Sequence, residues 1–318
     1  MRKRKLGRSD IEIAPLVLGG NVFGWTASEA TSFSILDAFV DAGFNAIDTA
    51  DVYSVFVPGN KGGESETVIG NWLKHSGKRS QVVIATKVGM QMAPDKTGLS
   101  RKHIMQSVED SLRRLQTDYI DMYFAHQDDP KTVLAETLAT FGELVSQGKV
   151  RTIGASNYTG IRLKEALTVS AQLGLPRYEY LQPHYNLYER AGYEQDLEPV
   201  CMREQLGVVP YFALASGFLT GKYRSEADFT KSPRGRRMGT YMNPHGLSIL
   251  KGLDEVAARY GATPAQVALA WLMSRPSVTA PISSATSVEQ LRDIAAAARL
   301  DLDREAIQTL DTASKAAA

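Results

Sequence analysis

The chain has 318 residues, 43% of them hydrophobic, which is enough apolar material for a sizeable core. Its 36 Lys and Arg residues nearly balance 35 Asp and Glu residues, so the formal net charge of +1 gives no electrostatic argument for binding nucleic acid or an anionic membrane. The single cysteine, Cys201, excludes an intrachain disulfide framework.

The first five residues, Met1 to Lys5, are basic, but no apolar segment follows them as it would in a signal peptide. No apolar run approaches the length needed to span a bilayer. We therefore expect a cytoplasmic protein without a membrane partner. The oligomeric state is left open.

The predicted elements begin with a hairpin, in which Lys3–Leu6 and Ile11–Ile13 flank a polar turn. Short apolar runs then alternate with amphipathic stretches. The predicted strand and helix pairs are Leu16–Leu18 with Ser34–Asp41, Ala46–Ile47 with Glu66–Lys74, Val82–Ala85 with Lys102–Leu115, Ile120–Phe124 with Thr132–Ser146, Val150–Gly154 with Ile161–Gln172, Tyr180–Leu181 with Leu197–Gln205, Val208–Leu214 with Ile249–Arg259 and Pro264–Met273, and Val278–Ile282 with Val288–Ala297.

This alternation predicts an α/β protein with a parallel sheet, and eight units of about 40 residues fit a (β/α)₈ TIM barrel. A further helix over Asp303–Ala313 ends the chain, and the hairpin is predicted to cap the bottom of the barrel. We expect one domain over residues 1–318. The alternative is a doubly wound open sheet, but Leu18–Gly24 lacks the Gly-x-Gly-x-x-Gly fingerprint.

Two long loops follow predicted strands, at Ser54–Gly63 and at Gly221–Gly246. Long loops in compact domains are often functional, and loops after barrel strands lie on the catalytic face. Both loops are therefore candidates for lining a site.

Polar side chains recur at the ends of three consecutive predicted strands. Asp48, Lys87 and His126 are separated by equal spacings, and Tyr53 follows Asp48 in the next loop. In a barrel, these ends lie side by side on one face. The sequence therefore predicts a cluster of a carboxylate, an ammonium, an imidazole and a phenol.

Such a cluster suits the protonation of an oxygen that gains negative charge. A phenol with a pKa near 10 is a weak acid at neutral pH, but a neighbouring ammonium lowers that pKa. A shift of about three units needs roughly 4 kcal/mol. We expect Lys87 to supply this shift, Asp48 to hold Lys87, and His126 to donate a hydrogen bond to the same substrate oxygen. A carbonyl that receives hydride is the obvious substrate group.

The residues at these strand ends resemble the aldo-keto reductase family over essentially the full chain. The resemblance rests on Asp48–Tyr53, Thr86-Lys87, His126–Asp128, Gly148–Asn157, Gln182 with Tyr185-Asn186, and Gly217–Lys222. It implies a (β/α)₈ barrel and reduction of aldehydes or ketones by a nicotinamide cofactor. It also implies a catalytic tetrad of Asp48, Tyr53, Lys87 and His126, with Tyr53 as the general acid.

The same resemblance implies a cofactor site along one side of the barrel mouth. Ser156, Asn157 and Gln182 would hold the carboxamide, Tyr211 would stack on the nicotinamide ring, and Leu214 to Lys222 would follow the pyrophosphate. Ser156-Asn157 is also a candidate N-cap for the next helix. The residues implied in cofactor binding are Gly20, Asp48, Ser156, Asn157, Gln182, Tyr211, Leu214, Gly217, Leu219, Lys222, Ser284, Thr286, Ser287, Gln290 and Asp293.

The chain departs from the family pattern at two places. Phe212 stands where the family often has Ser, and it either fills space or re-aims the following loop. Gln290 and Ile294 stand where Arg and Asn are frequent. Ser284 and Ser287 at a helix N-terminus still suit a 2′-phosphate, so we favour NADP over NAD. Arg234, Arg236 and Arg237 either add charge there or form a solvated surface run.

The predicted substrate pocket contains Trp25, Phe56 and Tyr185, although Trp25 and Phe56 also suit ordinary packing. The favoured function is NADP-dependent reduction of a small carbonyl substrate. One alternative is a Schiff-base aldolase that uses Lys87 as nucleophile. Another is a cofactor-sensing binding subunit, because the family also resembles ion-channel β-subunits. His126 and Asp128 do not make a complete metal-ligand set, so no metal is expected.

Overall fold

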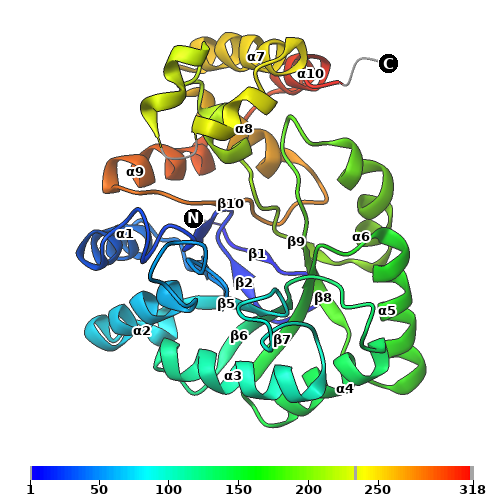
Figure 1. Ribbon diagram of the computed structural model, residues 1–318. Coiled ribbons are helices and arrows are strands. Elements are labelled where there is room, and N and C mark those ends of the chain that lie inside the picture. The colour runs from blue at the N-terminus through cyan, green and yellow to red at the C-terminus, as the bar shows by residue number, and fades with distance from the viewer. Residues whose placement is uncertain (1, 233–234, 316–318) are drawn as a thin grey trace.

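The computed structural model describes residues 2–232 and 235–315. Its centre is an eight-stranded, all-parallel sheet with the order β10-β3-β4-β5-β6-β7-β8-β9, so most strands neighbour the next strand in the chain (Figure 1). The strands are β3 (Val17–Gly19), β4 (Ala46–Asp48), β5 (Val83–Val88), β6 (Ile120–Ala125), β7 (Val150–Ser156), β8 (Tyr178–Gln182), β9 (Gly207–Val208) and β10 (Ile282–Ser283).

Backbone hydrogen bonds join the two ends of this sheet. Thr279 N donates to Val208 O at 2.8 Å, and Ile282 N donates to Pro210 O at 2.9 Å. These bonds link the segments around β9 and β10, so the sheet curls into a barrel rather than an open, doubly wound sheet. The predicted (β/α)₈ fold is confirmed.

Helices surround the barrel, as the alternating sequence pattern predicts (Figure 1). Several of them begin after a Ser, Thr, Asn or Asp whose side chain accepts a backbone N–H, including α1 after Ser28 and α9 after Ser287. The helices are α1 (Glu29–Asp41), α2 (Glu64–Ser76), α3 (Arg101–Leu115), α4 (Leu134–Ser146), α5 (Gly160–Leu173), α6 (Glu198–Glu204), α7 (Pro244–Tyr260), α8 (Pro264–Ser274), α9 (Val288–Ala296) and α10 (Arg304–Ala313).

Shorter helical turns occupy the connections between these elements. They are the 3₁₀ turns η1 (Arg79–Gln81), η3 (Ala215–Thr220), η4 (Glu226–Lys231), η5 (Gly235–Thr240) and η6 (Ala297–Arg299), and the π-helical turn η2 (Gly192–Leu197). Three of them, η3 to η5, lie within the long connection from β9 to α7. The predicted long loop in this region is therefore partly ordered into turns.

The N-terminal hairpin closes one end of the barrel. Strands β1 (Arg4–Lys5) and β2 (Glu12–Ile13) pair antiparallel, which confirms the predicted hairpin. Leu6, Ile11 and Ile13 are almost fully buried in the same cluster as side chains from inside the barrel, such as Val17 and Met122. Each such burial stabilises the fold by about 1.5–3 kcal/mol, as an upper estimate.

The seventh barrel strand is shorter than the predicted segment Val208–Leu214. Regular pairing stops at Val208, because Pro210 has no N–H and Phe212 adopts a left-handed backbone with φ of 52°. Tyr211 keeps one bond, from its N–H to Pro183 O at 2.9 Å. The chain leaves the sheet at this point and enters η3.

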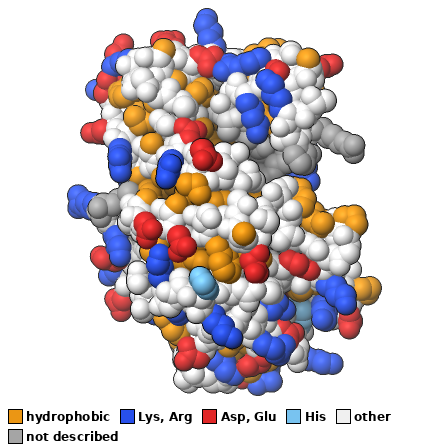
Figure 2. Space-filling view, turned by 90° about the vertical axis from the view of Figure 1, so that its left-hand side faces the viewer, with side chains coloured by type: hydrophobic (Ala, Val, Ile, Leu, Met, Phe, Trp, Pro, Cys, Tyr) orange, Lys and Arg blue, Asp and Glu red, His pale blue; other side chains and the backbone are white. Residues whose placement is uncertain are grey.

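The face carried by α1, α2 and α9 has side chains of both charge signs among apolar ones (Figure 2). This mixture agrees with the near-zero net charge. Within residues 2–232 and 235–315, no helix has both the length and the apolar character required to cross a bilayer.

Candidate active site

The predicted catalytic side chains meet at the carboxyl end of the barrel. Asp48 ends β4, Lys87 lies near the end of β5, and His126 directly follows β6, while Tyr53 lies in the turn after Asp48. Lys87 Nζ donates to Asp48 Oδ2 at 2.7 Å and to Tyr53 Oη at 3.0 Å. Tyr53 Oη in turn donates to Asp48 Oδ2 at 3.1 Å.

Lys87 is fully buried, and its third hydrogen bond goes to the carbonyl oxygen of Thr49 at 2.7 Å. Its ammonium therefore has three acceptors, which fix its position. Burial lowers the pKa of Lys87, while the Asp48 carboxylate acts to raise it. Asp48 is the group that keeps a charged lysine stable in this environment.

The phenol of Tyr53 differs from the expectation of a lowered pKa. Burial around its hydroxyl, followed by the Asp48 carboxylate, raises the pKa of Tyr53 well above its ordinary value. The sequence did not reveal that the Asp48 carboxylate touches Tyr53 as well as Lys87, so it opposes the effect of the ammonium. Tyr53 therefore carries its proton at neutral pH.

His126 lies against the edge of Tyr53, with ring centroids 6.1 Å apart at 73°. It is 6% exposed, and its Nδ1 has no hydrogen-bond partner among the described residues. Burial, assisted by Lys87, lowers the pKa of His126 well below its usual value. The imidazole is therefore neutral and holds one N–H.

Polar side chains continue from this cluster across β7 and β8. Gln182 Nε2 donates to Asp48 Oδ1 at 2.9 Å, and Ser156 Oγ donates to Gln182 O at 2.9 Å. Asn157 Nδ2 donates to His126 O at 2.8 Å, and its Oδ1 accepts from Tyr211 Oη at 2.8 Å. The structure thus brings the four predicted carboxamide and stacking residues together beside the tetrad.

Asn157 does not cap the following helix, which was the alternative for Ser156-Asn157. Thr159 is the N-cap of α5, and its side chain accepts from Arg162 N. Asn157 has a left-handed backbone with φ of 55° instead. This conformation costs energy for a non-glycine residue and directs the amide toward the barrel mouth.

Gly20 lies on the other side of Asp48, where its N–H donates to Asp48 O at 2.7 Å. An added Cβ would stand 2.9 Å from Ser65 Oγ and 3.0 Å from Asp48 O. A side chain here would crowd the Ser65 hydroxyl of α2 and the end of β4. Gly20 therefore supports the backbone that holds Asp48.

The segment from Leu214 to Lys222 forms a tight turn of unusual backbone geometry. Ala215, Ser216 and Gly217 have φ values of 47°, 58° and 99°, all in the left-handed region. The Lys222 ammonium folds back to within 3.7 Å of the place where a Gly217 Cβ would stand. Leu219 is fully buried, so its side chain belongs to the core.

The residues predicted for the adenosine end cluster at the start of α9. Ser287 caps the helix, and Gln290 Oε1 accepts from both Thr286 N and Thr286 Oγ1 at 3.0 Å. Ser284 Oγ donates to Asn21 Oδ1. Gln290 thus uses its amide oxygen internally.

Two other residues of α9 make their contacts within the protein. Asp293 accepts from Thr263 Oγ1 at 3.0 Å and from Gln266 Nε2 at 2.7 Å, so it joins the N-terminus of α8. Ile294 is buried in the core. Both contribute to helix packing in this structure.

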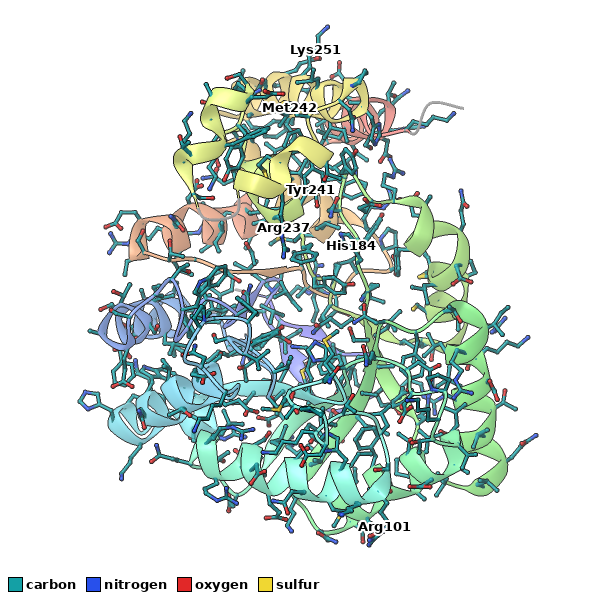
Figure 3. All side chains as sticks on the ribbon, viewed as in Figure 1. Arg101, His184, Arg237, Tyr241, Met242 and Lys251 are labelled. Atoms are coloured by element: carbon teal, nitrogen blue, oxygen red, sulfur yellow. The ribbon has the colours of Figure 1, made fainter. Side chains whose placement is uncertain are left out.

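The long loop after β9 contains the three arginines that were considered for the cofactor phosphate. Arg234 lies outside the described residues, as does the side chain of Arg236. Arg237, in η5, is exposed, and Figure 3 shows it above His184.

Two of the three predicted pocket residues meet at the rim. Trp25, in the loop after β3, and Phe56, in the loop after β4, form an edge-to-face pair with ring centroids 5.1 Å apart. Phe56 is 61% exposed. An aromatic pair therefore joins the loops that follow β3 and β4.

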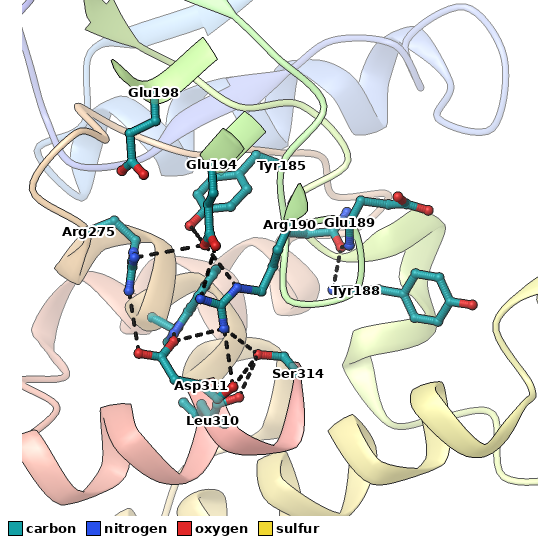
Figure 4. Close-up of polar contacts among 12 residues, drawn as sticks. Tyr185, Tyr188, Glu189, Arg190, Glu194, Glu198, Arg275, Leu310, Asp311 and Ser314 are labelled. Atoms are coloured by element: carbon teal, nitrogen blue, oxygen red, sulfur yellow. Dashed lines mark hydrogen bonds and ion pairs between the residues drawn. The ribbon is translucent and has the colours of Figure 1, made fainter. Parts of the chain in front are cut away.

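Tyr185 is not a pocket residue, which corrects the prediction. It is fully buried, packs on Tyr193 and Trp271, and donates to Glu194 Oε1 at 2.7 Å. Beyond the end of β8 the chain turns outward, so the alternation of the strand no longer decides where a side chain points. Figure 4 shows Tyr185 beside a network of ion pairs among Arg190, Glu194, Arg275 and Asp311, in which Arg190 also donates a hydrogen bond to Ser314.

His184 is a site residue that the sequence reasoning missed. Its ring stacks on Tyr211 with centroids 5.3 Å apart and planes 13° apart. This contact forms after β8 has ended, where side-chain alternation no longer predicts direction, so the sequence carried no signal for it.

No group of three or more His, Cys, Asp or Glu side chains is arranged to hold a metal ion in the part of the chain that the structure describes.

The family model for the aldo/keto reductase family matches residues 15–315. The chain belongs to the aldo/keto reductase family and is an NAD(P)H-dependent oxidoreductase.

Curated relatives match nearly the whole chain. The protein named "Uncharacterized oxidoreductase YrpG" from Bacillus subtilis is 35% identical, with 96% of this chain and 94% of the relative covered. "Putative voltage-gated potassium channel subunit beta" from Schizosaccharomyces pombe is 33% identical, with 91% and 85% covered. "Aldo-keto reductase YhdN" from Bacillus subtilis is 32% identical, with 96% and 89% covered.

Proposed function

We propose that this protein reduces an aldehyde or ketone to an alcohol with NADPH, and that Tyr53 is the general acid. The observation that carries the proposal is the hydrogen-bonded set of Lys87, Tyr53 and Asp48, with the neutral imidazole of His126 beside it. A phenol that keeps its proton at neutral pH is in the protonation state that a general acid requires.

The nicotinamide cofactor supplies a hydride to the carbonyl carbon when it is bound. Tyr53 then gives its proton to the carbonyl oxygen, whose basicity rises as negative charge develops there. Lys87 Nζ, 3.0 Å from the phenol oxygen, stabilises the phenolate that remains. The N–H of His126 orients the carbonyl oxygen, and Asp48 keeps Lys87 in position.

The donor set beside the tetrad fits a nicotinamide. A carboxamide needs both donors and acceptors, and Ser156, Asn157 and Gln182 supply hydroxyl and amide groups within one connected network. Tyr211 offers an aromatic ring tethered by its hydroxyl. The buried Nδ1 of His126 has no hydrogen-bond partner among the described residues, so a polar atom of a ligand could satisfy it.

The preference for NADPH over NADH rests on the N-terminus of α9. Ser287 and the helix dipole suit a phosphate, and Lys222 and Arg237 lie in the segments that follow β9. Gln290 adds no charge, so the expected preference is smaller than that of a site with an arginine there. The proposed preference for NADPH therefore depends on serine hydroxyls and backbone N–H groups at this helix N-terminus.

Titration of the purified protein with NADPH and with NADH, followed by quenching of Trp and Tyr emission, tests this proposal. We expect binding of both at micromolar concentration, with NADPH tighter. Absence of binding by either cofactor would remove the reductase mechanism. Tighter binding of NADH would overturn only the cofactor preference.

Two alternative functions, a Schiff-base aldolase and a cofactor-sensing subunit, can be distinguished from carbonyl reduction by experiment. A Schiff-base aldolase needs a free lysine amine, whereas Lys87 is buried with three acceptors, so borohydride trapping with substrate should leave Lys87 unlabelled. A cofactor-sensing subunit is suggested by the channel-subunit name of one relative. Such a protein would bind NADPH but oxidise it very slowly with every carbonyl compound tested.

A further inference from the structure

His184 backs the ring that is proposed to receive the nicotinamide. It lies two residues after the end of β8, and its ring stacks on Tyr211 at 5.3 Å with an interplanar angle of 13°. It also meets the edge of Phe212 at 5.4 Å and 72°. Tyr211 and Phe212 pack edge to face at 5.2 Å, so the three rings form one cluster, which we call the aromatic triad.

Asn186 fixes this triad from the side. Its Oδ1 accepts from Tyr188 N at 2.8 Å and from Glu189 N at 2.9 Å, which identifies the amide oxygen. Its Nδ2 therefore faces the triad as a donor, and it bonds to Phe212 O at 2.9 Å. This bond holds Phe212 in its left-handed conformation, at the start of the segment that leads to Gly217.

The same amide constrains the imidazole. Asn186 Nδ2 lies 3.5 Å from His184 Nε2, at the outer limit of a hydrogen bond. Burial also lowers the pKa of His184. The residue thus presents a neutral aromatic ring to Tyr211.

Tyr211 is consequently held at three points. His184 covers its ring, Asn157 accepts its hydroxyl at 2.8 Å, and its N–H bonds to Pro183 O. A ring fixed in this way loses little freedom when another flat ring stacks on it. Figure 3 shows His184 toward the centre of the molecule, below the segment that carries Arg237 and Tyr241.

We propose that His184 and Asn186 are positioning residues for the cofactor, with His184 fixing the Tyr211 platform and Asn186 fixing Phe212 and the turn that follows it. This inference rests on the proposed function, because it takes Tyr211 as the surface for the nicotinamide ring. It assigns to the unusual Phe212 a role in the triad rather than in substrate contact.

The test is NADPH binding to a set of variants, measured by fluorescence titration, together with thermal unfolding of each cofactor-free protein. His184→Ala removes the stacked ring, and we expect the Kd for NADPH to rise about five- to tenfold. His184→Phe keeps a flat ring and should return the Kd to within about twofold of the wild-type value.

Asn186→Asp tests the hydrogen bond from Asn186 Nδ2 to Phe212 O. It keeps the acceptor for Tyr188 and Glu189 but places an oxygen against Phe212 O, and we expect the Kd to rise about tenfold. His75→Ala is the control, because His75 also contacts an aromatic ring, Phe33 at 5.9 Å, but is exposed on α2. It should leave the Kd unchanged.

Unchanged NADPH binding by His184→Ala, with a folded protein, would overturn the role of His184. Equal weakening by His184→Phe and His184→Ala would also overturn it, because the stacked ring would then not be the cause. Unchanged NADPH binding by Asn186→Asp would overturn the positioning role of Asn186. If the wild-type protein itself bound no NADPH, the proposed function would fail, and this outcome is distinct from the others.

Discussion

Replacement of Lys87 by methionine separates the catalytic role of its charge from its role in stability. The ammonium lies 3.0 Å from the phenol oxygen of Tyr53. Coulomb's law with an effective dielectric constant of about 20 gives a stabilisation of the phenolate of about 5 kcal/mol at this distance. Loss of that interaction would slow proton donation by about three to four orders of magnitude.

The same substitution leaves the Asp48 carboxylate buried without its cation, although Gln182 and Tyr53 still donate to it. Removing one partner of a buried ion pair costs about 3–5 kcal/mol of folding free energy. We therefore expect Lys87→Met to be both nearly inactive and less stable. The double variant Asp48→Asn/Lys87→Met should recover much of the stability, since no unpaired charge remains, and none of the activity.

The assay is the single-turnover rate of NADPH oxidation with a saturating carbonyl substrate, alongside urea unfolding and the Kd for NADPH. The Kd should change little, because the hydrogen bonds of Lys87 to the described residues go to Asp48, Thr49 and Tyr53. A rate for Lys87→Met within tenfold of the wild-type rate would refute the reasoning. Recovery of activity in the double variant would refute it as well.

Three further predictions concern Tyr53, Asp51 and Leu6. Tyr53→Phe should lower carbonyl reduction at least about a thousandfold while NADPH still binds, as a titration and a turnover assay on the same sample would reveal. Asp51 is fully buried without a hydrogen-bond partner for either oxygen among the described residues, and burial, followed by Glu66, raises the pKa of Asp51 well above its usual value. A raised folded-state pKa means that stability present below the unfolded pKa of about 4 is lost as pH rises through the folded pKa. Asp51→Asn should therefore raise the melting temperature at pH 8 relative to wild type and give no such gain at pH 4; an equal effect at both pH values would contradict this. Leu6→Ala removes a fully buried side chain of the hairpin and should cost about 2–5 kcal/mol in urea unfolding, with NADPH affinity retained because the hairpin is at the other end of the barrel.

Much of the site was predictable because parallel strands place their carboxyl ends together. Asp48, Lys87 and His126 share one phase at consecutive strand ends, so their proximity follows from the barrel itself. Trp25 and Phe56 were likewise expected at the mouth from the loops that carry them, and they do form a pair there.

Other features needed the coordinates, because they depend on where the chain turns after a strand. Tyr185 was expected in the pocket, but the turn after β8 directs it to Glu194 and Trp271. The same turn brings His184 onto Tyr211, from a different strand end. Side-chain alternation cannot predict either contact once regular strand geometry has stopped.

The sequence by itself determined the alternation of strands and helices, the barrel, and the grouping of Asp48, Tyr53, Lys87 and His126 at one end of it, because these follow from local periodicity and chain order. Only the tertiary structure decided the ionisation of Tyr53, since burial of the phenol, followed by the nearby Asp48 carboxylate, raises the pKa of Tyr53. Burial and the contacts of 2.7 to 3.1 Å among Asp48, Tyr53 and Lys87 arise only when separate strands and loops pack side by side.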